Sequence, residues 1–173
     1  YPTRRLYKKL GEGEVHIFVG IKNVPEYHDS VIYSDDVVDR LSISILRDKN
    51  TSPVSKKEDL AGKSVIINLG YSYAGLREFV RDKNNNVTAI FGKSNKKMLQ
   101  LLASDRADYC VFYERIAKQA LSEYPLIDIE MDIIRKIDFY VILSKNAPHK
   151  NKLIAAMNKI AKEDSKSLGI GRY

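Results

Sequence analysis

The sequence predicts an α/β protein. Apolar runs of strand length alternate with segments in which apolar residues recur at helical spacing, and glycine or proline residues separate the two kinds of segment. The chain has 173 residues, of which 44% are hydrophobic and 29% charged. A chain of this length buries about two thirds of its unfolded surface, so it can form a core without disulfides or metal ions. We therefore expect a folded α/β protein with largely parallel sheets and helices on both faces.

Six segments have the character of β-strands. The run VHIFVGI at 15–21 is apolar throughout, which is typical of a strand buried on both faces. The segment 37–47 instead alternates apolar residues with serines along its second half, as a strand with two different faces does. The expected strands are 15–21, 37–47, 64–69, 87–91, 107–112 and 139–144.

Helices are expected between these strands and at both ends of the chain. The first has Pro2 near its start, and Gly11 follows its last residues. Ser72 and Ser94 are each placed to cap the N-terminus of a helix with the side-chain oxygen. The expected helices are 2–10, 72–83, a segment after Ser94, 113–123 and a segment after Pro148.

The net charge of +7 is concentrated at the two ends of the chain. Residues 1–10 carry a net charge of +4 and residues 145–173 a net charge of +5, so residues 11–144 are slightly acidic, at −2. Basic residues in amphipathic end helices most simply form solvated faces. Aromatic residues do not interleave with them, and no nucleic-acid recognition motif is present. We therefore predict no nucleic-acid partner, and no direct membrane insertion, because no segment approaches the ~20 apolar residues of a membrane helix.

Motifs of catalysis, cofactor binding and metal binding are absent from the sequence. His16, His28 and His149 are scattered along the chain, and Cys110 lies in the apolar run ADYCVF, where a thiol is typically packed rather than reactive. There is no P-loop, nucleophile elbow or zinc signature. We therefore predict a protein that is not an enzyme and that has no catalytic residues, no metal site and no cofactor.

One junction favours ligand binding. In SVIINLGYSYAGL a buried strand ends near Asn68 and Gly70 and passes directly into a helix, whose free backbone N–H groups suit an anionic group. The carboxyl ends of strands are also where open α/β sheets bind ligands. A tight turn with a serine cap explains the same residues equally well.

Five segments resemble, in the same order, those of the bacterial extracellular solute-binding proteins of family 3. These are periplasmic proteins of the amino-acid ABC-transporter type with the type II periplasmic binding fold. The matching segments are PTRRLYKKLGEGEVHIFVGI, VIYSDDVV, EDLAGKSVIINLGYSY, LASDRADYCVF and DFYVILSKNAPHKNKLIAAMNKI.

This resemblance implies two α/β lobes that close on a small solute by hinge bending. Residues 1–40 and 139–173 would form the first lobe and 45–135 the second, with the hinge near 39–45 and 135–140. The resemblance also implies a periplasmic location and an ABC permease as partner. The family begins with a strand, a helix and a further strand before the point that corresponds to Tyr1. We therefore expect an incomplete first lobe with exposed apolar surface.

The resemblance fails at the residues that hold an amino acid. Where the family has a threonine and an arginine that clamp the α-carboxylate, this chain has Lys22 and Tyr27. The aspartate that receives the α-amino group is replaced by Tyr113, with Glu114 beside it. An ordinary α-amino acid is therefore an unexpected ligand, and we expect an aromatic wall around a different solute. The expected ligand-binding residues are Gly20, Lys22, Tyr27, Asn68, Gly70, Tyr71, Ser72, Tyr73, Tyr113 and Glu114.

Two alternative functions are compatible with the same fold. The loss of the amino-acid clamps is compatible with a sensor module of a membrane signalling protein. A dehydratase of the cyclohexadienyl type would need a proton-transfer group, for which Glu114 and Lys22 are the candidates. We rank the dehydratase last because no positioned acid–base pair can be found in the sequence.

Overall fold

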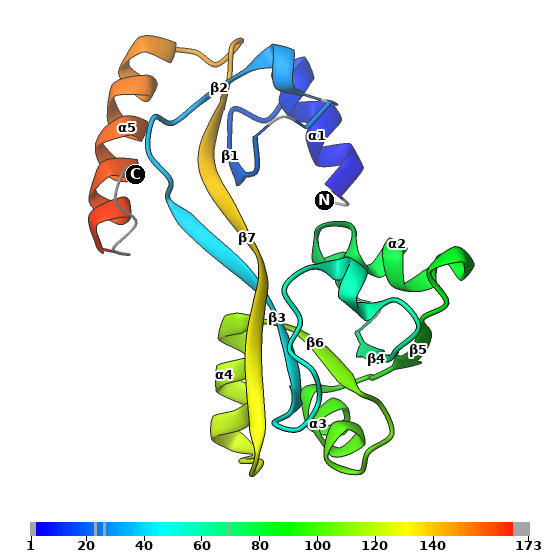
Figure 1. The fold of residues 1–173 in the computed structure, drawn as a ribbon. Helices are drawn as coiled ribbons and strands as arrows, with labels where there is room; N and C mark the ends of the chain where they lie inside the picture. The colour runs from blue at the N-terminus through cyan, green and yellow to red at the C-terminus, as the bar shows by residue number, and fades with distance from the viewer. Residues whose placement is uncertain (1–2, 23, 26, 69, 168–173) are drawn as a thin grey trace. The chain divides into compact units, whose positions relative to one another are not determined.

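A computed structural model describes residues 3–167 apart from 23, 26 and 69, so Pro2 and Leu69 lie outside the described residues (Figure 1). The chain divides into two compact units. Unit 1 consists of the residues up to Arg40 together with those from Ile137 onward, and unit 2 is Leu41–Lys136. Two strands, β3 (Asp39–Asp48) and β7 (Ile129–Ser144), have residues in both units.

Unit 1 is built around the C-terminal half of β7. The strands β1 (Ile17–Gly20) and β2 (Val31–Tyr33) both pair with it in antiparallel fashion, one on each edge. The helix α1 (Thr3–Glu12) precedes β1, a short 3-10 helix (His28–Ser30) precedes β2, and α5 (Lys150–Ser167) follows β7. The two long helices are therefore the ones expected at the ends of the chain.

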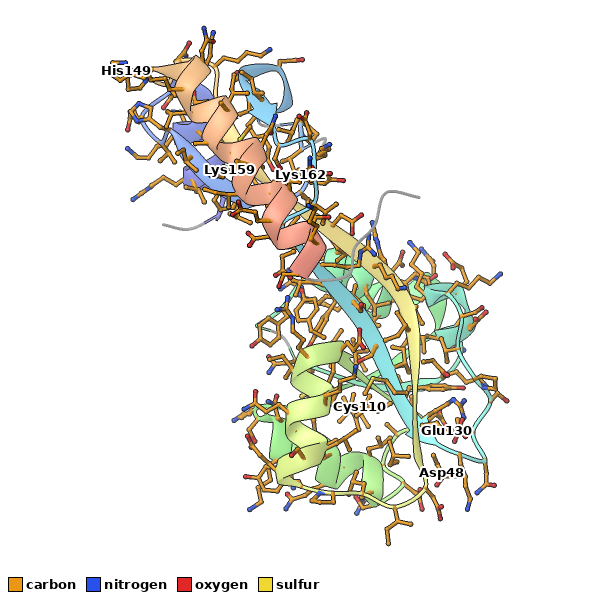
Figure 2. All side chains as sticks on the ribbon, turned by 90° about the vertical axis from the view of Figure 1, so that its left-hand side faces the viewer. Asp48, Cys110, Glu130, His149, Lys159 and Lys162 are labelled. Carbon is orange, nitrogen blue, oxygen red and sulfur yellow. The ribbon has the colours of Figure 1, made fainter. Side chains whose placement is uncertain are left out.

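Alternate residues of β7 face two small cores in unit 1. Ile142 packs with Leu10 of α1, whereas the next residue, Leu143, packs with Met157 of α5. This is the alternation of faces along a strand. The basic residues of α5 lie outside these cores, since Lys159 and Lys162 are exposed (Figure 2). The basic end helix thus has the solvated face that its charge pattern predicts.

β1 differs from the expectation of a strand buried on both faces. Ile17 is 52% and Val19 47% exposed, whereas Gly20 is buried. β7 occupies one edge of β1, and among the described residues no strand pairs with its other edge. The strand is apolar throughout, but only one of its faces is covered. The exposed apolar surface expected on this lobe is present at Ile17 and Val19.

Unit 2 contains the parallel part of the structure. Its strands β3, β6 (Tyr109–Tyr113), β4 (Ser64–Ile67) and β5 (Thr88–Phe91) lie side by side in that order, and β7 lies beside β3. β4 is parallel to both β5 and β6, while β3 and β6 are antiparallel. Parallel pairing is thus confined, among the pairs described, to these three strands.

Helices cover both sides of this sheet. α3 (Asn95–Ala103) and α4 (Glu114–Glu123) pack on the face that carries Ile66 and Cys110, and α2 (Leu76–Arg81) lies on the other side of β4 and β5 from α3 (Figure 1). Ser94 caps α3 as expected, because its hydroxyl accepts a hydrogen bond from the backbone N–H of Lys97. Cys110 is fully buried (Figure 2), and burial raises the pKa of its thiol. A buried neutral thiol is the packed residue that its apolar strand predicts.

β7 is far longer than the expected strand at 139–144. Its first ten residues, IEMDIIRKID, begin with apolar and charged residues in alternation, which is a strand signal that the expected bounds left out. The structure pairs these charges across to β3. The buried Arg47 donates to Asp132 at 2.7 Å and to Glu130 at 2.5 Å, and also donates to the carbonyl of Thr51 at 2.9 Å. These bonds satisfy the buried guanidinium.

Candidate functional site

The turn after β4 carries half of the predicted site residues and has an unusual backbone. The Asn68 side-chain oxygen accepts a hydrogen bond from the N–H of Gly70 at 2.8 Å and starts the turn. Tyr73 and Ala74 then have φ values of 48° and 49°, and Gly75 has φ of 92°. The left-handed region costs an ordinary L-residue about 1–2 kcal/mol. Two consecutive non-glycine residues in that region make this a strained turn, and strain of this kind concentrates at ligand sites.

The helix expected at 72–83 is replaced by two shorter elements. A 3-10 helix covers Tyr73–Gly75, and α2 begins only at Leu76. The expectation that Ser72 caps the helix is wrong, because its side chain makes no capping bond and Gly75 takes the N-cap position of α2 instead. A direct passage from strand to helix is absent here, so the geometry that favours an anion at this junction is not formed.

Three tyrosines of unit 2 meet beside this turn and form what we call the tyrosine cluster: Tyr71, Tyr73 and Tyr113. Tyr71 makes edge-to-face contacts with both other rings, each with centroids 5.6 Å apart. The rings of Tyr73 and Tyr113 are 4.9 Å apart and tilted by 34°. Such geometries are favourable for aromatic pairs. The sequence separates Tyr113 from the other two by about forty positions, and the parallel strands β4 and β6 bring them together.

The members of the tyrosine cluster differ in exposure. Tyr73 is 2% exposed, and burial raises the pKa of its phenol, which is hydrogen-bonded to the backbone of Asn68. Tyr113 is half-buried, and burial raises its pKa too, opposed by hydrogen bonds from the backbone of Tyr73 and the hydroxyl of Ser72. Tyr71 is 43% exposed. Tyr71 and Tyr113 can therefore offer ring surface to a ligand, while Tyr73 supports them from within.

Glu114 lies at the first position of α4, directly after Tyr113. Lys118 donates to its carboxylate at 2.7 Å. The hydrogen bonds from Lys118 and from the hydroxyl of Ser42 lower the pKa of this carboxyl despite partial burial. Glu114 is thus ionised and already paired near neutral pH. These properties do not suit the proton donor that a dehydratase would need.

Lys22 of unit 1 follows the end of β1 and is held against aromatic rings. Its ammonium group lies 3.8 Å from the ring centroid of Tyr140 and 5.7 Å from that of Tyr33. Cation–π contacts of this length are attractive, and they hold the long side chain of Lys22 against the two rings. Lys22 is exposed, so the charge stays accessible to an anion in solution. Tyr140 was not expected at the site, because its sequence position shows only an apolar strand.

Two expected contacts in unit 1 have a packing role instead. Tyr27 is 1% exposed, its ring packs edge-on against Tyr7 with centroids 4.9 Å apart, and its hydroxyl donates to the carbonyl of Ile21 at 2.7 Å. The expectation of Tyr27 as part of an exposed aromatic wall is therefore corrected. Gly20 is buried as well, and a Cβ there would come within 2.4 Å of the Phe18 ring. Its small size is required by packing.

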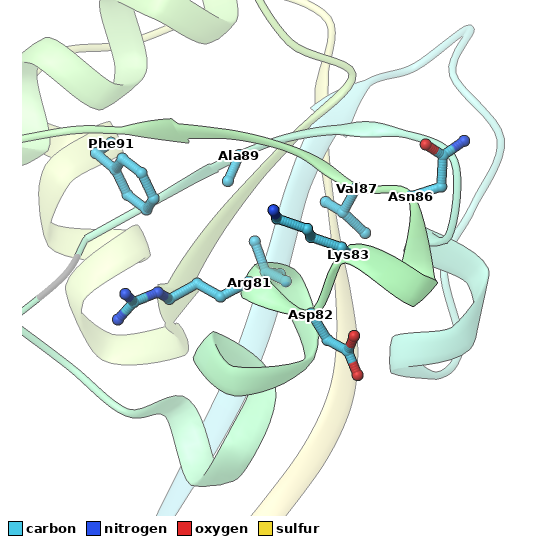
Figure 3. A pocket seen from close by; sticks show the side chains of 8 residues that line it. Arg81, Asp82, Lys83, Asn86, Val87, Ala89 and Phe91 are labelled. Carbon is cyan, nitrogen blue, oxygen red and sulfur yellow. The ribbon is translucent and has the colours of Figure 1, made fainter.

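One cavity in unit 2 is lined by none of the predicted site residues. Its volume is about 530 Å³, and it lies over β5 next to the end of α2 (Figure 3). Lys83 reaches toward Ala89, whereas Asp82 points away and caps the N–H of Asn84. The cavity is wide open to solvent. No sequence motif marks the residues that line it. Its lining residues are Val80, Arg81, Asp82, Lys83, Asn86, Val87, Ala89 and Phe91.

No group of three or more histidine, cysteine, aspartate or glutamate side chains in the described part of the chain is placed to hold a metal ion. Among the helices of the described residues, none has the length and apolar character needed to cross a membrane.

Comparison with solved structures identifies the architecture. An ancestral arginine-binding protein bound to arginine matches with a TM-score of 0.56 and 20% identity, over 96% of this chain and 73% of that one. The substrate-binding protein of an amino acid ABC transporter matches with a TM-score of 0.51 and 22% identity, over 98% and 73%. The fold is that of the type II periplasmic binding proteins.

A third solved structure with this fold is a sensor domain and not a transporter subunit. A histidine kinase sensor domain with similarity to periplasmic binding proteins matches with a TM-score of 0.55 and 16% identity, over 95% of this chain and 70% of that one. Scans of family models and of curated protein sequences found no match. The structural matches thus establish the periplasmic-binding fold. Their sequence identities are too low to indicate the ligand.

Proposed function

We propose that this chain is a non-enzymatic solute-binding protein that captures a small molecule for an ABC-type importer in the periplasm. The observation that carries the proposal is the tyrosine cluster beside the strained turn at the carboxyl end of β4. Ligands bind at the carboxyl ends of strands in open α/β sheets. Neighbours with the same fold include an arginine-binding protein and the substrate-binding protein of an amino acid ABC transporter. We propose that Tyr71 and Tyr113 form the solute-binding surface of unit 2 and that Lys22 is the anion-binding residue of unit 1.

The proposed solute is not an ordinary α-amino acid. Lys22 stands where the family has a threonine, and Tyr27 stands where it has the arginine that can bind a carboxylate with two parallel hydrogen bonds. A lysine offers only a point charge. Tyr113 replaces the carboxylate that would receive an α-ammonium group. Glu114, the nearest carboxylate in sequence, is already paired with Lys118. We infer an apolar or aromatic body that stacks on tyrosine and carries an anionic group.

A thermal-unfolding screen tests the proposal. The full chain is heated with single compounds from a panel of aromatic and aliphatic carboxylates, amines, sugars and the standard amino acids, since a ligand of the native state raises the midpoint. We expect a concentration-dependent increase with at least one aromatic or aliphatic carboxylate and none with α-amino acids. An increase with arginine or glutamine comparable to that with the best carboxylate would refute the proposed specificity.

A sensor module is the second candidate. It is favoured by the match to the histidine kinase sensor domain, whose fold is the same. The two candidates share the solute site and differ in the partner. The coding sequence distinguishes them, because a sensor requires a membrane helix and a signalling domain in the same gene, whereas an importer subunit requires a permease gene nearby.

A further inference from the structure

The strained turn beside the tyrosine cluster is hydrogen-bonded to a side chain of β7. Nη1 of Arg135 donates a hydrogen bond to the carbonyl of Ala74, at 2.8 Å. Ala74 is the middle one of the three consecutive residues with positive φ. The bond therefore holds the carbonyl of a residue whose backbone would relax elsewhere without support.

Arg135 has a distinctive place in the chain. It lies in β7, two residues before Ile137, at which unit 1 resumes. β7 is one of the two strands with residues in both units. Among the described residues, Arg135 is the side chain of β7 that bonds to the strained turn. The expected strand at 139–144 begins after Arg135, so this contact was not predicted.

A small cavity lies beside the bond. Its volume is about 170 Å³, and Ile43, Tyr73, Leu76, Ile134 and Arg135 are among its lining residues. Close packing normally prevents a buried ring from moving. Here the cavity gives the turn and the ring of Tyr73 room to shift if the bond is lost. The rest of the turn is held by backbone bonds, in which Gly75 and Arg77 both donate to the carbonyl of Ser72 at 3.2 Å.

We propose that Arg135 is a positioning residue that fixes the strained turn to β7 and so couples the conformation of β7 to the tyrosine cluster. The role follows from the order of contacts. β7 places Arg135, Arg135 holds Ala74, and Ala74 adjoins Tyr73, whose backbone N–H and ring both contact Tyr113. The proposal rests on the proposed function only in that the tyrosine cluster is the solute-binding surface. Arg135 itself touches no solute in this scheme.

Amide hydrogen exchange of the full chain tests the positioning role without any ligand. In Arg135→Gln we expect the amides of Gly75 and Arg77 to exchange at least about tenfold faster through local opening, with core amides of β4 unchanged. Arg135→Lys retains a donor on a long stem and should restore much of the protection. Arg106→Gln, which removes an exposed arginine elsewhere in unit 2, is the matched control and should leave both amides unchanged.

A spectroscopic readout separates positioning from general stability. In Arg135→Gln the ring resonances of Tyr71 and Tyr113 should shift, while those of the exposed Tyr124 stay in place. Unchanged exchange at Gly75 and Arg77, or an equal increase throughout unit 2, would overturn the proposal. These outcomes need no solute, so they stand apart from the thermal screen. If the screen yields a solute, its affinity should also fall in Arg135→Gln without a matching loss of stability.

Discussion

At the scale of single residues, Ala74 is the clearest sign that the turn is built for something other than stability. A loop that served only to connect β4 and α2 would be expected to have glycine or asparagine at its left-handed positions. Here tyrosine and alanine occupy two of the three. The strain is compatible with a backbone selected to place Tyr71 and Tyr73.

Replacing Ala74 by glycine should therefore stabilise the protein. Glycine adopts positive φ without strain, which removes about 1–2 kcal/mol, and the greater freedom of glycine in the unfolded chain offsets about 0.4–1 kcal/mol of that. We expect Ala74→Gly to raise the free energy of unfolding by about 0.5–1 kcal/mol in urea titrations. Ala103→Gly in α3 is the control and should lower it by a similar amount. Equal destabilisation by both substitutions would contradict the strain at Ala74.

The burial of an individual side chain was predictable only where its neighbours in the sequence determine it. The packed state of Cys110 follows from its apolar strand. Tyr27 and Tyr71 are both tyrosines in loops, yet one is buried in a core and the other is exposed. Tyr27 is buried because its ring packs on Tyr7 and its hydroxyl bonds to Ile21. The residues next to Tyr27 in the sequence do not reveal these tertiary contacts.

At the scale of elements, the first part of β7 was missed although its sequence carries a strand signal. Ile129, Met131 and Ile133 alternate with Glu130 and Asp132, which is the period of a strand with one charged face. Its partner β3 supplies the compensation through Arg47, whose side chain is 6% exposed. Local pattern cannot reveal a charge that is satisfied by a strand more than eighty positions away. The expected helix at 72–83 failed for a related reason, since the turn that breaks it is stabilised by Arg135 and the tyrosine cluster.

The ion pair between Arg47 and Asp132 should matter for stability. Asp132 also accepts a hydrogen bond from the N–H of Val54 at 2.9 Å, and its side chain is 18% exposed. Breaking a fully buried pair costs about 3–5 kcal/mol. We expect Asp132→Asn to lose about 2–3 kcal/mol, because Glu130 still contacts the guanidinium. Asp128→Asn removes the exposed pair with Lys49 and should lose less than about 1 kcal/mol.

The same pair predicts a pH dependence. Burial alone would raise the pKa of Asp132, but hydrogen bonds from Arg47 and Val54 outweigh it and lower the pKa. A carboxyl whose pKa is lower in the folded state stabilises the protein above its unfolded pKa of about 3.9. That contribution is lost as the pH falls below this value toward the folded pKa. The gap between wild type and Asp132→Asn should therefore shrink between about pH 7 and pH 3. A gap that stays constant over this range would contradict the assignment.

At the scale of the whole molecule, the fold was predictable and the ligand was not. The order of five family-like segments is enough to imply the periplasmic-binding fold, and the solved structures confirm it. Unit 2 brings together Tyr71, Tyr73 and Tyr113, and their role in ligand binding stays a prediction. The hinge near 39–45 and 135–140 stays a prediction. The ligand depends on a few substituted side chains, and neither pattern nor fold determines their specificity.

The most direct test is a map of where the solute binds. The best compound from the thermal screen is titrated into the ¹⁵N-labelled full chain, and amide shifts are followed by NMR. We predict saturable shifts at Tyr71, Tyr113 and Glu114, with affinity reduced at least about tenfold in Tyr71→Ala and unchanged in Tyr124→Ala. Shifts confined to the β5 cavity around Lys83 and Phe91, or equal affinity in both variants, would contradict a solute site at the tyrosine cluster.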